Sequence, residues 1–233
     1  MSVYKILKEI ESNRNKKKGK ILSRFFKTDK GEYGEGDIFW GLNVPVSRKI
    51  ALKYKDLPLS DINLLLKNKV HEVRLIGLLV LVWRYKNSGM EEKEKIVKFY
   101  LKNTKYVNNW DLVDLSSHYI LGDYLSDKKD KTILLKLAKS KNLWEQRIAI
   151  VSTYALIRKG DLSWTFKISK MFLGHDHDLI HKASGWMLRE AGKKNEKALK
   201  KFLDANISKM PRTMLRYAIE KFPEEVRREY LRK

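Results

Sequence analysis

The feature that most constrains the fold is a set of positions that recurs at intervals of 34 to 37 residues. Each position carries a charged residue in a stretch of helical periodicity, and the set is Arg74, Asp111, Arg147, Lys182 and Arg216. A period in this range with two helices per unit is typical of a helical solenoid. Stacked units of this kind share a continuous core and curve around a concave surface. The sequence therefore predicts an all-α superhelix of helical repeats, with the weakest repeat, 211–222, as a cap.

Polar residues and glycines predict where several of these helices begin and end. Asp61 and Ser163 are expected helix starts, because short polar side chains can accept hydrogen bonds from the first turn. Gly122, Gly160 and Gly192 are expected helix ends. Glycine readily adopts the backbone conformation that terminates a helix.

One segment, 25–48, does not fit the repeat. It contains Gly31, Gly34 and Gly36 together with Tyr33 and Pro45. No Gly-Lys-Ser/Thr follows the glycines and no strand precedes them, which argues against a Walker loop and a dinucleotide fingerprint. We expect a structured loop that leads into the first solenoid helices and touches the ligand. Because no linker is long enough to divide the chain, residues 1–233 are expected to form one domain.

The charge balance points to a polyanionic partner. Fifty Lys and Arg stand against 28 Asp and Glu, which gives a formal net charge of +22. Nucleic acid and an anionic membrane surface both fit such a balance, and a generally lysine-rich composition is the alternative explanation. The absence of cysteine excludes disulfides, a thiol nucleophile and Cys-ligated zinc, and it fits a reducing cytoplasm. No apolar run approaches the roughly 18 residues of a membrane span, and residues 1–20 lack the pattern of a signal peptide.

One position breaks the repeat pattern. Three residues beyond the first four recurring charges lie Gly77, Asp114, Ile150 and Gly185. Three of them suit close packing between helices, and the fourth is a carboxylate. A half-buried acid costs several kcal/mol unless something compensates it, and chains tend to break local patterns at functional sites. Asp114 is therefore the first catalytic candidate.

Other residues join this carboxylate if equivalent helices line one concave wall. Trp110 lies four residues before Asp114 and shares its helix face. Arg147 and Trp186 lie on the next two equivalent helices. Aromatic faces stack on bases and attract cations, and arginine suits phosphate. A carboxylate can stabilise an oxocarbenium-like sugar. The pattern therefore predicts that two indoles, a guanidinium and a carboxylate converge on one cleft.

Three runs of residues resemble the AlkD-like family of DNA alkylation repair glycosylases. They are Asn-Trp-Asp-Leu-Val-Asp at 109–114, Trp-Glu-Gln-Arg at 144–147 and Lys-Ala-Ser-Gly-Trp-Met-Leu-Arg-Glu at 182–190. The run 26–34, followed by Pro45 and Arg48, is also similar. The similarity spans roughly residues 20 to 220. It departs from the family pattern at Asn109, where the family typically has a second tryptophan, and this difference could alter the substrate scope.

The resemblance implies a HEAT-like superhelix with a concave DNA-binding face. It implies removal of positively charged N3- and N7-alkylated purines, such as 3-methyladenine and 7-methylguanine, from double-stranded DNA, without a metal or organic cofactor. Asp114 then is the catalytic carboxylate, Trp110 and Trp186 hold the damaged nucleotide, and Arg147 grips phosphate. We expect a monomer that works in the cytoplasm, at the nucleoid, and makes no use of a membrane.

The chemistry is reasonable in physical terms. Alkylation at N3 or N7 makes the purine a cationic leaving group that needs no general acid. One carboxylate then suffices, where hydrolysis of a neutral glycoside usually uses two. The positive surroundings should keep Asp114 ionised. Whether the damaged base is extruded from the helix is left open by the sequence.

Further residues are assigned to contacts with DNA or to structure. Tyr33, Arg189, Lys193 and Lys194 are candidates for contacts with the DNA backbone, which set register without reading sequence. Asp111 is expected to be a structural hydrogen-bond acceptor near its helix start.

The histidines at 175, 177 and 181 invite a metal hypothesis. The glutamate that a zincin requires after His177 is absent, so we expect no metal site. Helix capping by Asp176 or Asp178 is expected instead.

Two other functions remain as alternatives. One is a non-catalytic HEAT-like module that binds damaged or branched DNA through shape and charge, with steep salt dependence and no base release. The other is a helical scaffold for protein partners, which would bind DNA only weakly. Neither requires an inward acid flanked by two tryptophans.

Overall fold

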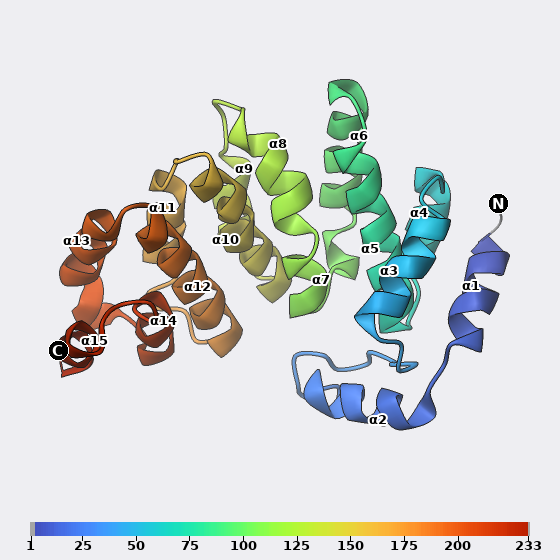
Figure 1. Cartoon of the computed structure of the whole chain (residues 1–233), viewed down its shortest axis with the longest axis horizontal. Helices are drawn as coiled ribbons and strands as arrows, with labels where there is room; N and C mark the ends of the chain where they lie inside the picture. Colours follow the sequence, from blue (N-terminus) through green and yellow to red (C-terminus); the bar gives the residue numbers. More distant parts are fainter. Residues whose placement is uncertain (1–2, 233) are drawn as a thin grey trace. The chain divides into compact units, whose positions relative to one another are not determined.

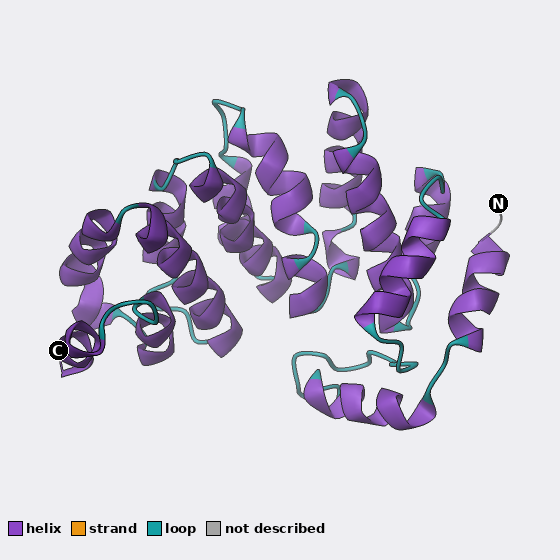
Figure 2. Ribbon diagram, in the orientation of Figure 1, coloured by secondary structure: helices purple, strands orange, loops and turns teal. Residues whose placement is uncertain are grey.

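The computed structural model describes residues 3–232. Every regular secondary-structure element in this range is a helix, which confirms the predicted all-α class (Figure 2). The one β-feature in this range is an isolated parallel bridge between Ile38 and Val70. The helices group into two compact units that meet between Ile120 and Leu121. Each unit is described by itself, and the single domain expected over 1–233 stays a prediction. Among the described helices, none combines the length and apolarity needed to cross a bilayer.

The described part of the first unit, residues 3–120, holds the helices from α1 to α7 and a short 3-10 helix (Figure 1). They are α1 (Val3–Ser12), α2 (Lys16–Phe25), α3 (Val44–Lys53), α4 (Leu59–Leu66), α5 (His71–Lys86), α6 (Met90–Lys102), η1 (Thr104–Tyr106) and α7 (Trp110–Asp114). Helix α5 is central, because α3 and α4 pack on it and its first eight residues are all buried. Gly77 permits this packing: a methyl group there would lie 3.1 Å from Cβ of Leu65.

The second unit is also built from successive helices. They are α8 (Asp123–Ser126), α9 (Ile133–Ala138), α10 (Leu143–Arg158), α11 (Ser163–Met171), α12 (Asp178–Lys194), α13 (Glu196–Asn206), η3 (Ile207–Lys209), α14 (Arg212–Ala218) and α15 (Glu224–Arg232). Helix α12 packs against α10 and α14. A methyl group at Gly185 would lie 2.5 Å from the carbonyl oxygen of Met214, and Ile150 is fully buried. The close-packing role expected at both positions is confirmed.

Two of the three expected glycine stops are wrong. Helix α10 does end before Gly160, whose φ of 90° suits glycine. Gly122 instead lies inside a helical path, and Gly192 lies inside α12. At both positions a neighbouring helix approaches too closely for a side chain. A methyl group added at Gly122 would lie 2.3 Å from the carbonyl oxygen of Ser152, and one added at Gly192 would lie 2.4 Å from Cδ2 of Leu199. Both glycines allow close contact between helices, which overrides their tendency to end one.

Of the two expected helix starts, one is confirmed and the other is displaced by two residues. Helix α11 begins at Ser163 as predicted. Helix α4 begins at Leu59, two residues before the expected Asp61, which lies in its first turn. Pro58 directly precedes α4 and has an extended backbone. Proline disfavours a helical conformation in the residue before it, so the helix starts after Pro58.

The helix expected around Asp114 is broken. Helix α7 ends at Asp114, and a π-helical turn, η2 (His118–Gly122), follows after three intervening residues and spans the boundary between the units. The hydroxyl of Ser116 donates to the carbonyl oxygen of Leu112 at 2.6 Å and lies 3.0 Å from the hydroxyl of Tyr100. Such bonding of a side chain to its own helix tends to bend the helix. The break thus places the candidate carboxylate at a helix end.

The segment between α2 and α3, residues 26–43, is a structured loop, which confirms the loop expected over 25–48 except at its ends: Phe25 lies in α2 and residues 44–48 lie in α3. The carboxylate of Glu72 on α5 accepts hydrogen bonds from the backbone N–H groups of Trp40, Gly41 and Leu42 at 2.7–3.2 Å. Gly41 has a φ of 86°, a conformation that favours glycine. The loop is thereby fixed across the start of α5, beside the segment that leads into α7.

Candidate functional site

The start of α7 is set by Asn109. Its side-chain oxygen accepts the backbone N–H of Trp110 at 2.8 Å, and its amide nitrogen lies 3.4 Å from Oδ2 of Asp37. The side chain is fully buried. Asparagine is a favoured residue at a helix start because it can satisfy an otherwise unpaired N–H group. The residue that departs from the resembled family therefore faces the interior and anchors α7.

Trp110 is held by aromatic rings from the loop and from the adjoining ends of α2 and α5. Its indole stacks on Phe26, with ring centroids 5.2 Å apart, and Phe26 stacks on Phe39 at 4.9 Å. Phe39 in turn stacks on the imidazole of His71 at 4.4 Å. Phe25, which is largely exposed, meets the indole edge-on at 6.0 Å. One face of the half-buried indole is thus covered, which fixes the orientation of the ring.

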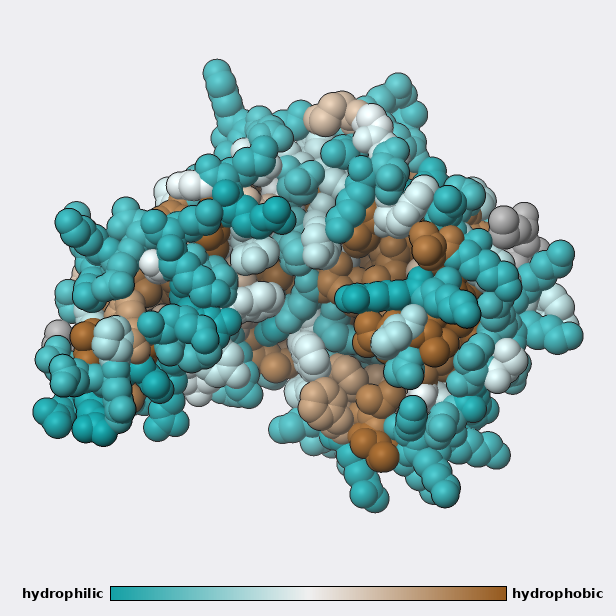
Figure 3. Space-filling view, viewed as in Figure 1, coloured by the Kyte–Doolittle hydropathy of each residue, from teal (hydrophilic) through white to brown (hydrophobic). Residues whose placement is uncertain are grey.

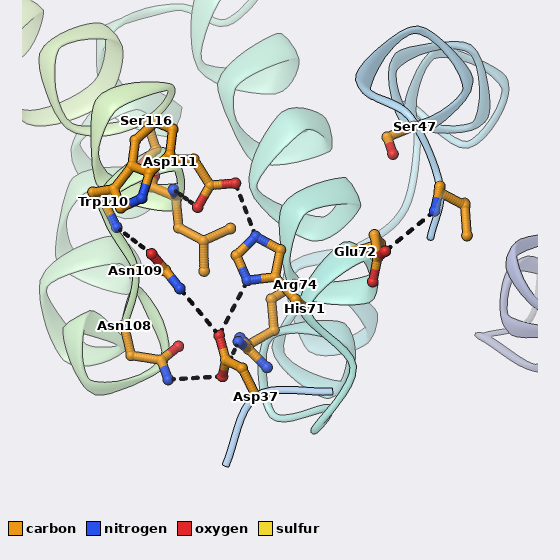
Figure 4. A network of polar contacts seen from close by, with 12 residues as sticks. Asp37, Ser47, His71, Glu72, Arg74, Asn108, Asn109, Trp110, Asp111 and Ser116 are labelled. Carbon is orange, nitrogen blue, oxygen red and sulfur yellow. Dashed lines mark hydrogen bonds and ion pairs between the residues drawn. The ribbon is translucent and has the colours of Figure 1, made fainter. Parts of the chain in front are cut away.

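A cluster of buried polar groups lies behind this stack. The Asp37 cluster, as we call it, consists of Asp37, His71, Arg74, Asn108, Asn109 and Asp111 (Figure 4). Asp37 is its centre. One carboxylate oxygen accepts from Nη2 of Arg74 at 2.6 Å, and the other faces Nδ1 of His71 at 3.1 Å. The cluster joins the loop, the start of α5 and the start of α7, so it positions the helix that carries Trp110 and Asp114.

The imidazole of His71 lies between two carboxylates. Its Nε2 atom is 2.8 Å from Oδ2 of Asp111, whose Oδ1 accepts the backbone N–H of Leu112 at the same distance. The structural acceptor role expected for Asp111 is confirmed. Burial lowers the pKa of His71, but the charge of Asp111 and hydrogen bonds to both carboxylates outweigh burial and raise it. With a carboxylate on each ring nitrogen, the charged imidazolium is the favoured form.

Asp37 shows the complementary effect. Burial acts to raise the pKa of its carboxyl group, but hydrogen bonds from His71 and Asn109 and the charge of Arg74 hold the pKa below its ordinary value. Two anions and two cations therefore balance inside the cluster. Such compensation is what allows charges to be buried at all.

The contribution of His71 to the stability of the fold should decrease as pH rises above the ordinary pKa of histidine. Because the pKa of His71 is raised by folding, its stabilising contribution is fully present below about pH 6.5 and is lost as pH rises through the raised pKa. We expect the wild type to lose more unfolding free energy between pH 6 and pH 9 than His71→Leu does. Urea unfolding at both pH values measures this difference. Equal losses in the two proteins would show that His71 does not titrate as its surroundings require.

Asp114 closes α7, four residues after Trp110 and on the same helix face. Its side chain is half-buried. Nearby Tyr100 is fully buried, and its pKa is raised mainly by that burial and further by the negative charge of Asp114. The phenol of Tyr100 is therefore neutral at physiological pH. A carboxylate and a fixed indole thus share one helix face in the first unit.

The second unit holds the remaining principal candidates. Arg147 on α10 is buried, and its Nη1 atom donates to the carbonyl oxygen of Leu179 on α12 at 2.6 Å. Trp186 on α12 is half-buried, with its ring 6.1 Å from that of Tyr154. Arg147 thus joins two neighbouring helices, and the indole of Trp186 is partly accessible. The convergence of these residues with Trp110 and Asp114 stays a prediction.

The candidates for backbone contact lie at partly or fully exposed positions. Arg189 pairs with Glu190 and Glu220, and Lys193 pairs with Glu190 at 2.8 Å. Lys194, at the end of α12, is exposed. Exposed ion pairs contribute little and exchange readily, so the exposed cations Lys193 and Lys194 can still meet phosphate, whereas the side chain of Arg189 is only 17% exposed.

Tyr33 lies in the loop of the first unit. Its hydroxyl donates to the carbonyl oxygen of Phe25 at 3.5 Å. This contact places Tyr33 beside the end of α2 and beside the aromatic stack.

The histidine-rich turn before α12 has a structural role that differs from the expectation. A ring nitrogen of His177 accepts the backbone N–H of Leu179 at 3.1 Å, so this histidine caps the helix. Asp178 is the first helical residue and pairs with Lys182 at 2.7 Å. The expected cap by Asp176 or Asp178 is therefore wrong, because a ring nitrogen supplies the acceptor. Residues 3–232 contain no group of three His, Asp or Glu side chains that could hold a metal ion.

Sequence reasoning missed Asp37, His71 and Phe26. Only His71 carries a local signal. His71 lies three residues before Arg74 at the start of a repeat helix, where a polar side chain can be buried only with partners.

Comparisons with known proteins add independent information. Residues 6–222 match the family described as DNA alkylation repair enzyme. A solved structure described as a predicted DNA alkylation repair enzyme from Enterococcus faecalis is similar in fold, with a TM-score of 0.70 over 91% of this chain and 98% of that chain. The two sequences are 16% identical, so this likeness concerns the fold. No curated protein matches the chain.

Proposed function

The chain belongs to the family of DNA alkylation repair enzymes, and we propose that it is an AlkD-like DNA N-glycosylase of base excision repair. Its substrate is double-stranded DNA that carries positively charged N3- or N7-alkylated purines. The reaction hydrolyses the bond between the alkylated base and its sugar. The net charge of +22 supports a polyanionic substrate.

One observation carries this proposal above all. The half-buried carboxylate of Asp114 shares a helix face with Trp110, whose indole is fixed by stacking on Phe26. An indole with one covered face offers the other to a cationic base by stacking and cation–π attraction. A carboxylate beside it attracts the positive charge that develops on the sugar.

The alkylated base leaves as a neutral purine when the glycosidic bond breaks, so no general acid is needed. Asp114 stabilises the oxocarbenium-like sugar and orients the water that attacks it. Preorganised charge of this kind is effective because it needs no rearrangement during the reaction. The Asp37 cluster supplies the preorganisation by anchoring the start of α7.

The remaining candidates bind the substrate in this proposal. Trp186 contacts the damaged nucleotide and Arg147 the phosphate. Tyr33, Arg189, Lys193 and Lys194 contact the DNA backbone. The chain acts as a monomer and uses no metal or organic cofactor.

Release of bases from alkylated duplex DNA tests the function. We expect the wild type to release 7-methylguanine and 3-methyladenine from methylated duplexes in single-turnover reactions, and to release nothing from unmodified duplexes of the same sequence. Chromatography of the freed bases measures both. Salt-sensitive DNA binding without release from either lesion would contradict the glycosylase proposal and favour a DNA-binding module.

A further inference from the structure

A pocket in the first unit lies between α3 and α5. This α3–α5 pocket has a volume of about 430 Å³, which is in the range of roughly 300–1,000 Å³ found for small-ligand sites. Leu52, Leu79 and Val82 supply apolar surface in it. Hydrophobic side chains gather over α3 and α5 on the face shown in Figure 3, and hydrophilic side chains cross them. The pocket is therefore an apolar hollow with a polar edge.

The polar and aromatic groups of the pocket define what it can bind. Trp83 and Tyr119 line it, and so do the cationic side chains of Arg48 and Lys86. The ammonium of Lys86 lies 3.6 Å from the ring centroid of Tyr119. Among the described residues that line this pocket, none is acidic. A matching ligand has a flat apolar part that stacks on aromatic rings and an anionic part that meets the two cations.

We propose that the α3–α5 pocket binds an unpaired nucleotide of the DNA whose base is uncharged. A nucleotide combines a planar base with a phosphate, and its single unit suits the size of the pocket. The inference rests on the proposed function only in taking DNA as the partner.

The charge of the pocket separates this nucleotide from the alkylated one. An N3- or N7-alkylated purine is a cation, which Arg48 and Lys86 repel and which the carboxylate of Asp114 attracts. Leu115, which lines the pocket, directly follows Asp114 in sequence. The first unit thus offers two neighbouring sites of opposite charge preference. A cationic base suits the Trp110 face, and a neutral base suits the α3–α5 pocket.

Binding of undamaged DNA tests the inference apart from catalysis. Two labelled duplexes of equal length are compared by fluorescence anisotropy at one salt concentration, one fully paired and one with a single unpaired thymidine. We expect the wild type to bind the bulged duplex about tenfold more tightly. Replacing the thymidine with 2-aminopurine should give fluorescence that falls on binding, because the base stacks on Trp83 and Tyr119.

Two leucines of matched exposure provide the variant and its control. Leu52 lines the pocket and is 57% exposed, whereas Leu64 on α4 does not line it and is 55% exposed. Leu52→Glu should reduce the preference for the bulge to within about twofold, because its carboxylate repels the phosphate. Leu64→Glu makes the same change in net charge and should keep the preference. Lys86→Gln gives a second test that removes a cation from the pocket.

Several results would overturn the inference. Equal binding of both duplexes by the wild type would do so, as would an undiminished preference in both Leu52→Glu and Lys86→Gln. Binding of free thymidine monophosphate as tight as binding of the bulged duplex would assign the pocket to a small molecule instead. These outcomes are distinct from failure of the proposed function, which is read from base release. A bulge preference without base release would support the pocket while removing the glycosylase.

Discussion

Asp114→Asn is expected to slow base release from duplex DNA at least about a hundredfold in single-turnover reactions, a loss of about 2.7 kcal/mol of transition-state stabilisation. Asparagine has nearly the same shape, so the variant removes charge and leaves the helix intact. The cationic sugar that forms as the base departs then loses the stabilising charge of this carboxylate. The rate of release from N7-methylguanine DNA, measured with enzyme in excess, gives the effect directly.

Two controls separate a role of Asp114 in catalysis from other effects of the substitution: the affinity for DNA and the same substitution at another aspartate. The affinity of Asp114→Asn for the same duplex should stay close to that of the wild type, since the carboxylate acts on the transition state. Asp123→Asn, which neutralises an exposed acid at the start of α8, should react at the wild-type rate. A variant at Asp114 that reacts as fast as the one at Asp123 would remove Asp114 from the reaction.

Asp37→Leu is expected to lower the free energy of unfolding by about 3–5 kcal/mol, the usual cost of breaking a buried ion pair by removing one partner. Leucine leaves Arg74 and His71 buried without the carboxylate that both contact. It also removes the acceptor for the amides of Asn108 and Asn109. Urea unfolding followed by circular dichroism measures the loss.

A second acid in the same loop serves as the control. Asp29 is exposed, so Asp29→Leu removes the same charge without breaking a buried pair. Its effect should stay within about 0.5 kcal/mol, as is usual for surface substitutions. If both variants were equally stable, the Asp37 cluster would contribute no more than a surface charge, and its role in anchoring α7 would have to be abandoned.

The repeated helices could be predicted from the sequence because their signal is local and periodic. Gly77 and Gly185 fall at equivalent positions, and both allow a neighbouring helix to approach closely. The break after Asp114 carries no such signal. It accompanies the contact between Ser116 and Tyr100, which are 16 residues apart and meet only when α6 packs beside α7. Tertiary contacts of this kind override helical periodicity.

The candidate site was predictable to the extent that it follows helix geometry. Trp110 and Asp114 share a face because they are four residues apart. The cluster behind them joins Asp37 to His71 and Asn109, at separations of 34 and 72 residues. In a chain that is 33% charged, a single buried acid looks like any other surface acid. Burial depends on which distant segments meet, and no local pattern records that.

The long separations within the Asp37 cluster also bear on the order in which the first unit folds. Contacts between neighbouring helices such as α4 and α5 close short loops and form early, whereas contacts across 72 residues must wait until the intervening chain is in place. The support of α7 is therefore expected to assemble last. Asp37 variants should accordingly speed unfolding more than they slow folding in stopped-flow measurements. The segment proposed for catalysis would then unfold first, while the helical repeats are still folded.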